Sequence, residues 1–195
     1  MTMASSTHSA AHTPAASDVD ATATQLVLWP YLFDQASPLY RELVLERHLA
    51  EAIGGEFQPH RDPYLFGYEL VLRSSDAEAP ARAAIDAALS ALSQGRVDER
   101  LLANVKSHLL ASLVMDSDTP HDAAVWLAYY VGLTGDPGYL NTVMERAARV
   151  TPADLASFAR QWLVPTNRTT VVVANEPVAP SASAGAGASR AGGAR

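Results

Sequence analysis

The sequence predicts an α+β fold in which helices pack on one face of an antiparallel sheet. Residues 65–72 place apolar or aromatic residues at every second position, which is the period of a half-buried strand. Helical periodicity then continues through five segments, and the β-branched run at 168–174 predicts a closing strand. Because strands and helices are segregated along the chain, the pattern favours α+β over a doubly wound sheet.

Composition bounds the functions that the chain can have. Its 195 residues fit one domain, and a hydrophobic fraction of 48% supplies a core. The net charge of −7 without a basic cluster argues against nucleic acid as a partner, and no basic amphipathic stretch points to a membrane surface. The absence of cysteine excludes disulfides, thiolate zinc sites and cysteine nucleophiles.

Both ends of the chain are rich in small residues. We expect residues 1–17 and 177–195 to be disordered tails around a domain at 18–176, since such segments bury too little surface to offset their chain entropy. No apolar run is long enough for a membrane span, and the first sixteen residues do not form a secretory signal. The compartment is unknown, with the cytoplasm as the default.

The predicted domain opens with two helices. Leu26, Trp29 and Phe33 form a helical stripe that Pro30 would kink, although a strand at 26–29 is an alternative. Ser37 followed by Pro38 has the form of an N-cap and a first helical residue, which predicts that the second helix begins there.

A hairpin follows the second helix. The Gly54-Gly55 pair ends the helical pattern, and we expect a first strand near 53–57, a loop at 58–64 with two prolines, and a second strand at 65–72.

The rest of the domain is predicted to be mostly helical. Its longest stripe recurs every four residues at Val97, Leu101, Val105, Leu109 and Leu113, and we expect it to pack in the core. Three Thr-Pro or Asp-Pro sequences, at residues 119, 136 and 151, predict helix starts, and the acids that accompany them suit the positive end of a helix dipole.

A search for catalytic chemistry yields no site residues: we predict no catalytic, cofactor-binding or metal-binding residue. His48 and Glu51 begin a His-x-x-Glu-His pattern, but Ala52 stands where the second histidine would be. We therefore expect them to be a surface pair, and we expect no cofactor in this chain.

The remaining histidines and aromatics are interpreted as structural. His8 and His12 lie in the expected tail, His60 and Asp62 with Arg61 in a solvated loop, His108 beside the long stripe, and His121 in a capping sequence. Trp126, Tyr129, Tyr130 and Trp162 are most simply the core and rim of packed helices, and a ligand or partner surface is the less favoured interpretation.

Several segments together resemble the insulinase-like (pitrilysin-type) zinc metallopeptidases. The run from Ser37 to Ile53 resembles the family's helix-to-strand segment, and Asp62 to Leu70 resembles its next strand. Gly95-Arg-Val-Asp-Glu-Arg-Leu resembles "Gly-Val-Thr-Glu-Glu-Glu-Leu", and Val150-Thr-Pro-Ala-Asp-Leu resembles "Val-Thr-x-Glu-Asp-Val". The resemblance spans roughly residues 20 to 176 and implies a metallopeptidase half-domain of the LuxS/MPP-like type.

The resemblance also implies a role. In that family one half carries His-x-x-Glu-His and zinc, and a zinc-free half helps to hold the peptide; this chain resembles part of the zinc-free half. The expected partner is a zinc-bearing peptidase subunit, which would supply the zinc and through which a peptide substrate would be met. The alignment places Val44 and Glu51 at the family's substrate-gripping Arg and Tyr, and the family's opening strand is not seen before residue 20. A stand-alone protein-binding module or a truncated remnant is the alternative.

Overall fold

The computed structural model describes residues 5–55, 57–116 and 119–173. The strands are β1 (Ser5–Thr13), β2 (Ala50–Gly54), β3 (Tyr64–Leu72) and β4 (Arg168–Val173). The helices are α1 (Val19–Phe33), α2 (Pro38–Tyr40), α3 (Glu78–Ser93), α4 (Glu99–Asp116), α5 (Pro120–Thr134), α6 (Tyr139–Arg149) and α7 (Pro152–Trp162). A π-helical turn, Arg41–Glu46, continues α2, and short 3₁₀ turns lie at Ser75–Ala77 and Pro165–Asn167.

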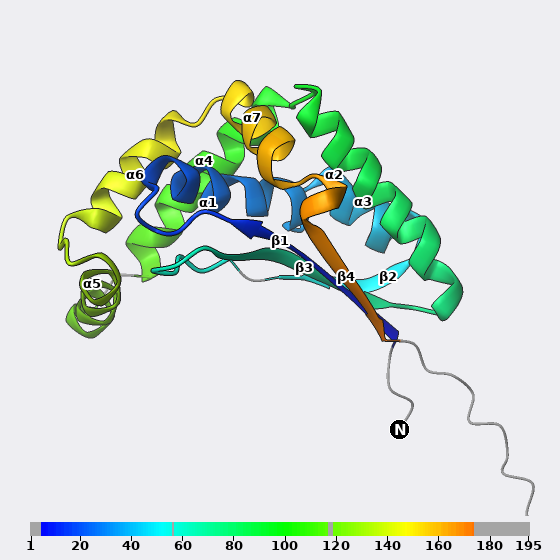
Figure 1. Ribbon diagram of the computed structural model, residues 1–195, viewed down its shortest axis with the longest axis horizontal. Helices are drawn as coiled ribbons and strands as arrows, with labels where there is room; N and C mark the ends of the chain where they lie inside the picture. The colour runs from blue at the N-terminus through cyan, green and yellow to red at the C-terminus, as the bar shows by residue number, and fades with distance from the viewer. Residues whose placement is uncertain (1–4, 56, 117–118, 174–195) are drawn as a thin grey trace, which may run out of the picture.

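The sheet has the strand order β2-β3-β1-β4, and every neighbouring pair is antiparallel. The helices other than α5 lie together on one face of this sheet, and α5 lies beyond one end of it. No described element covers the opposite face, which is the lower side in Figure 1. This arrangement confirms the predicted α+β architecture with helices on one face.

Strand β1 overturns the prediction that residues 1–17 form a tail. Residues 5–13 face β3 along their whole length and β4 over residues 6–11, so this segment is a central strand of the sheet. Its side chains alternate: Thr7, Ser9, Ala11 and Thr13 are buried, whereas His8 and His12 are exposed. Apart from its threonines, this segment has few residues with a strong strand preference, and here hydrogen bonding from two flanking strands holds it in the sheet. The opening strand expected to be missing is therefore present.

The first two helices form where the sequence predicts them. Asp18 accepts a hydrogen bond from the Ala21 amide at 2.9 Å and caps α1, which excludes the alternative of a strand at 26–29. Pro30 lies within α1. Ser37 accepts a hydrogen bond from the Tyr40 amide at 3.0 Å, which confirms it as the N-cap of α2.

The hairpin is confirmed, but its first strand begins earlier than predicted. Strand β2 occupies Ala50–Gly54 rather than 53–57, and its ladder with β3 shifts register between Ala50 and Ala52. The chain turns into β2 at His48, which has a positive φ of 49°. The helical pattern therefore ends at the π-helical turn before His48, ahead of Gly54.

The described side chains of the long stripe pack toward the core as predicted: Val105 is buried, and Leu101 and Leu109 pack against the same cluster, beside the buried Leu102. The side chain of Leu113 lies outside the described part of the structure. Val97 also contacts that cluster but precedes α4, which begins at Glu99. The core itself lies between the sheet and the helices, with Leu28, Leu43, Leu70, Ile85 and Leu155 all fully buried.

Two of the three predicted helix starts carry the expected caps. Thr119 and Thr151 accept hydrogen bonds from the amides of Asp122 and Asp154, both at 3.2 Å. Asp136 does not cap α6, which begins at Tyr139 after Gly138. Its carboxylate instead accepts from the Gly138 amide at 2.8 Å, so it closes a turn before the helix.

Strand β4 corrects a second expectation. Its β-branched run is typical of a buried strand, yet β4 lies at the edge of the sheet and pairs with β1 alone among the described strands. Val171, Val172 and Val173 are 54%, 45% and 46% exposed.

Candidate functional site

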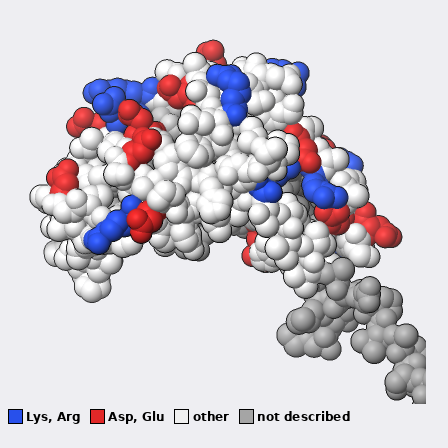
Figure 2. Space-filling view, viewed as in Figure 1, with Lys and Arg blue, Asp and Glu red and all other residues white. Residues whose placement is uncertain are grey.

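The uncovered face of the sheet contains a shallow hollow of about 870 Å³. Strand alternation supplies its lining, because residues that face away from the helices all point to this side. The lining includes His8, Ala10 and His12 of β1, Leu65, Gly67 and Glu69 of β3, and Thr169 and Val171 of β4. In Figure 2 the lower outline of the molecule curves inward between α5 and the far end of the sheet.

Few charged groups face the hollow. His8 Nε2 lies 3.4 Å from Glu69 Oε1 and 3.2 Å from Ser6 Oγ. Both members of the His8–Glu69 pair are about half exposed, so the pair adds little stability in water. On the side drawn in Figure 2, acidic and basic residues are interspersed, and no large patch of one sign appears. The lining of the hollow itself contains one acidic residue, Glu69, and no Lys or Arg.

Two glycines keep the floor of the hollow low. A Cβ added at Gly67 would lie 2.8 Å from the Ser9 carbonyl oxygen and 3.1 Å from the Ala10 Cβ. One added at Gly55 would lie 2.6 Å from the Gly67 carbonyl oxygen and 2.8 Å from Trp29 Nε1. A side chain at Gly67 would push β1 and β3 apart, and one at Gly55 would collide with the backbone of β3 and with Trp29 of α1, so both glycines permit close approach.

The structure separates the residues of the partial zinc motif. His48 lies in the left-handed turn before β2, with Nδ1 3.1 Å from the Val44 carbonyl oxygen. Glu51 is exposed on β2, so the two side chains share no helix face, and the expected surface pair does not form. Among the described residues no three His, Cys, Asp or Glu side chains gather as metal ligands, and the residues present do not fit zinc.

The two positions aligned with the gripping Arg and Tyr also lie apart from the hollow. Val44 is buried in the core at 8% exposure. Glu51 lies on β2, whose residues do not line the hollow. Neither side chain takes part in the site.

The loop with His60, Arg61 and Asp62 serves to hold α5. Arg61 Nη2 donates to the Gly132 carbonyl oxygen at 2.7 Å, and the His60 carbonyl oxygen accepts from the Ala16 amide at 2.7 Å. Tyr129 donates from its hydroxyl to the Pro59 carbonyl oxygen, also at 2.7 Å. The loop therefore ties α5 to the β2–β3 connection and to the segment after β1.

The aromatic residues form the predicted packing cluster, except Trp162. Trp126 stacks on Tyr130 at a ring distance of 6.0 Å, and Tyr130 contacts Tyr139 of α6 at 5.6 Å. Burial raises the pKa of Tyr130 to about 12, and the neighbouring tyrosines add to the shift. The Tyr139 hydroxyl donates to the Ala16 carbonyl oxygen at 2.7 Å. Trp162 packs against the core separately, and its carbonyl oxygen accepts from Asn167.

His8 and His12 are the residues of the hollow that sequence reasoning missed. The composition predicts a tail at both positions, but β1 brings them to the open face. The available signal was their spacing, since residues four apart in a strand share a face. The position of His108 beside the long stripe predicts a partly buried side chain, but His108 is exposed on α4. His121 is exposed on α5, and neither histidine lines the hollow.

The fold is that of the inactive M16 peptidase domains among solved structures, which confirms the half-domain fold that the sequence resemblance implies. No protein-family model and no curated protein matches the chain. Among solved structures, the inactive peptidase domain of a protein assigned as a zinc protease from Bordetella parapertussis is 20% identical with a TM-score of 0.76. The match covers 91% of this chain and 95% of that one.

Longer proteins contain the same fold as one part. A protease from Helicobacter pylori is 22% identical with a TM-score of 0.78, and the match covers 87% of this chain but 41% of that chain. A peptidase M16 inactive domain from Pseudomonas fluorescens is 19% identical with a TM-score of 0.72, with coverage of 91% and 43%. This chain thus spans less than half the length of these two neighbours.

Within the described residues, no helix combines the length and apolarity that a membrane crossing needs.

Proposed function

We propose that this chain is a non-catalytic lobe of a zinc peptidase assembly, and that its open sheet face forms part of the wall against which a peptide lies. The observation that carries the proposal is the fold, which is shared with the inactive peptidase domain of a protein assigned as a zinc protease and with a peptidase M16 inactive domain. The hollow on the uncovered face adds to it, since its low, weakly charged floor suits an extended peptide.

The chemistry of cleavage would come from elsewhere in the assembly. Metallopeptidases need a metal-bound water and a general base, and the described residues of this chain bring together no set of ligands for that metal. The zinc would be held by a partner half, and this chain would contribute surface and positioning. The partner would be a zinc-bearing peptidase subunit, consistent with neighbours in which the fold occupies about two fifths of a longer chain.

Co-purification tests this proposal. The full chain, carrying an affinity tag, is expressed together with a zinc-bearing peptidase half encoded in the same genome. We expect the two to elute together at a fixed ratio. Separate elution from every such half, combined with no effect on their activity, would contradict the proposed role.

A stand-alone binding module is the second candidate function. It is favoured by the positions that the resemblance assigns to substrate gripping, because Val44 is buried in the core and Glu51 does not line the hollow. The same co-purification separates the two candidates, since a stand-alone module needs no zinc-bearing partner.

A further inference from the structure

The two edges of the sheet differ in how well they are protected against pairing with another strand. Strand β2 is short, its ladder shifts register between Ala50 and Ala52, and it carries the exposed charge of Glu51. All three features discourage edge-to-edge association. Strand β4 is only one residue longer than β2 but lacks the other two features: its ladder with β1 runs without a shift, and residues 169–173 are uncharged and β-branched.

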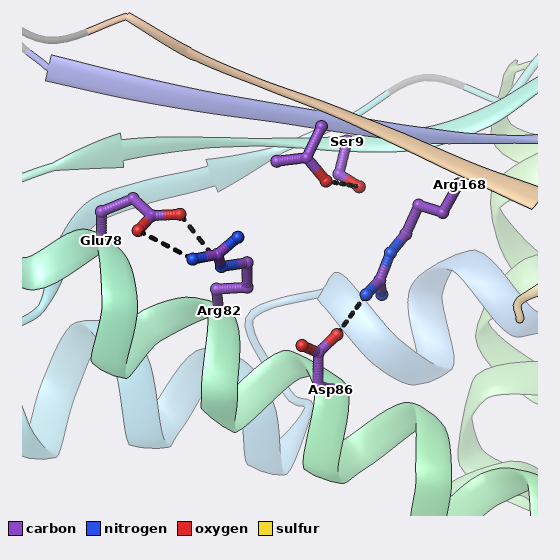
Figure 3. A network of polar contacts seen from close by, with 6 residues as sticks. Ser9, Glu78, Arg82, Asp86 and Arg168 are labelled. Carbon is purple, nitrogen blue, oxygen red and sulfur yellow. Dashed lines mark hydrogen bonds and ion pairs between the residues drawn. The ribbon is translucent and has the colours of Figure 1, made fainter. Parts of the chain in front are cut away.

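The one charged side chain of β4 forms an ion pair within the same chain. Arg168 is the one charged residue of this strand, and it turns toward α3, where its guanidinium pairs with the Asp86 carboxylate (Figure 3). Its side chain is 13% exposed. On the same side of the sheet, Ser9 Oγ bonds to Thr170 Oγ1 at 3.0 Å and ties β4 to β1. The rest of the strand is left with exposed valines.

Those valines lie on both faces of the sheet edge. Val171 and Val173 belong to the open face, and Val172 belongs to the helix-covered face yet is 45% exposed. The edge of β4 that faces away from β1 pairs with no described strand. An uncharged, regular and apolar edge of this kind is a template for one more strand.

We propose that β4 pairs with β4 of a second copy of this chain, as an antiparallel continuation of the sheet about a two-fold axis. In an antiparallel pair, facing residues lie on the same side of the sheet, so a two-fold axis perpendicular to it must set one residue against itself. With Val171 as that residue, Thr170 faces Val172, and Thr169 faces Val173. Within residues 169–173, every pair then joins two β-branched residues, and such pairs stabilise sheets.

The second copy is favoured over a different protein because this register is self-complementary. No like charges meet across it, although each chain carries a net charge of −7. A strand of six residues contributes less than the ~800 Å² per partner of a standard interface, so the association is weak and reversible. This inference does not depend on the proposed peptidase role, since it needs only the chain itself.

Sedimentation of the full chain over a range of concentrations tests the pairing. We expect the wild-type mass to rise toward twice the monomer mass. Val171→Lys should weaken association by about tenfold or more, because the axis sets the two introduced ammonium groups opposite each other. Val171 is half exposed, so folding should be retained, which circular dichroism checks.

Mixing Val171→Lys with Val171→Glu gives the sharpest test. If Val171 faces its own copy, the mixture should associate more tightly than either variant alone. Ala52→Lys on the β2 edge and Leu127→Lys on the exposed side of α5 are controls, and both should associate as the wild type does.

A wild-type chain that stays monomeric at all concentrations would overturn the proposal. Association lost in the Leu127→Lys variant but kept in Val171→Lys would overturn it as well, and would place the contact on α5. A mixture that associates no better than its components would exclude the Val171-centred register.

Discussion

The hydroxyl of Thr7 provides a direct test that residues 5–13 form a central strand. Thr7 is 1% exposed, it faces Leu70 of β3 and Val172 of β4, and its Oγ1 atom is buried without a hydrogen-bond partner. A buried hydroxyl without a partner costs about 1–3 kcal/mol. Thr7→Val replaces it with a methyl group of nearly the same size, so the substitution should stabilise the fold.

The size of the effect follows from that cost. Recovering ~1 kcal/mol raises Tm by about 2–4 °C in a domain of this length. Thr7→Asp should do the opposite, since an unpaired buried charge costs about 3–5 kcal/mol. Thr166→Val is the matched control, because Thr166 is exposed and its hydroxyl reaches water, so its Tm should stay near that of the wild type.

Thermal melts followed by circular dichroism measure all three variants. If residues 1–17 were a tail, both substitutions at Thr7 would leave Tm unchanged. That result would refute the placement of β1 between β3 and β4.

Two further predictions concern the tyrosine cluster and the C-terminal segment. Because the pKa of Tyr130 is raised in the folded protein, its contribution to stability is complete below the unfolded pKa of about 10 and is lost as pH rises through about 12. Tyr130→Phe should flatten this decline in stability. Urea unfolding of the wild type and the variant across this pH range measures the difference. Residues 177–195 lie outside the described residues and contain no large apolar side chain beyond Val178. Deleting them should therefore leave Tm within about 1 °C of the full chain. A cooperative loss of helix signal on deletion would show that the predicted boundary is wrong.

The helices were predictable because their signals are local. An N-cap such as Ser37 or Thr151 acts within four residues, so its sequence pattern carries its structure. Asp136 shows the limit of this reasoning, because the same Asp-Pro pattern can close a turn instead of capping a helix. The local sequence does not decide between the two outcomes.

The sheet was harder to predict because strand pairing is not local. Strand β1 has few residues with strong strand preference, and what holds it is contact with β3 and β4, far away in sequence. For the same reason, the β-branched run of β4 predicted a strand correctly but not its place at the edge.

The candidate site escaped prediction for a related reason. Its floor joins β1, β3 and β4, and His8, Gly67 and Val171 become neighbours only when these strands pair. The sequence shows that a zinc ligand is missing, because Ala52 stands at the position of the second histidine in the incomplete zinc motif. It does not show which face of the sheet remains uncovered.

Peptide cleavage by a zinc-bearing half from the same genome, with and without this chain, tests the central claim most directly. The account predicts that this chain alone cleaves no unstructured peptide, and that it binds the zinc-bearing half and raises its chelator-sensitive cleavage. Chelator-sensitive cleavage by this chain alone would contradict the account.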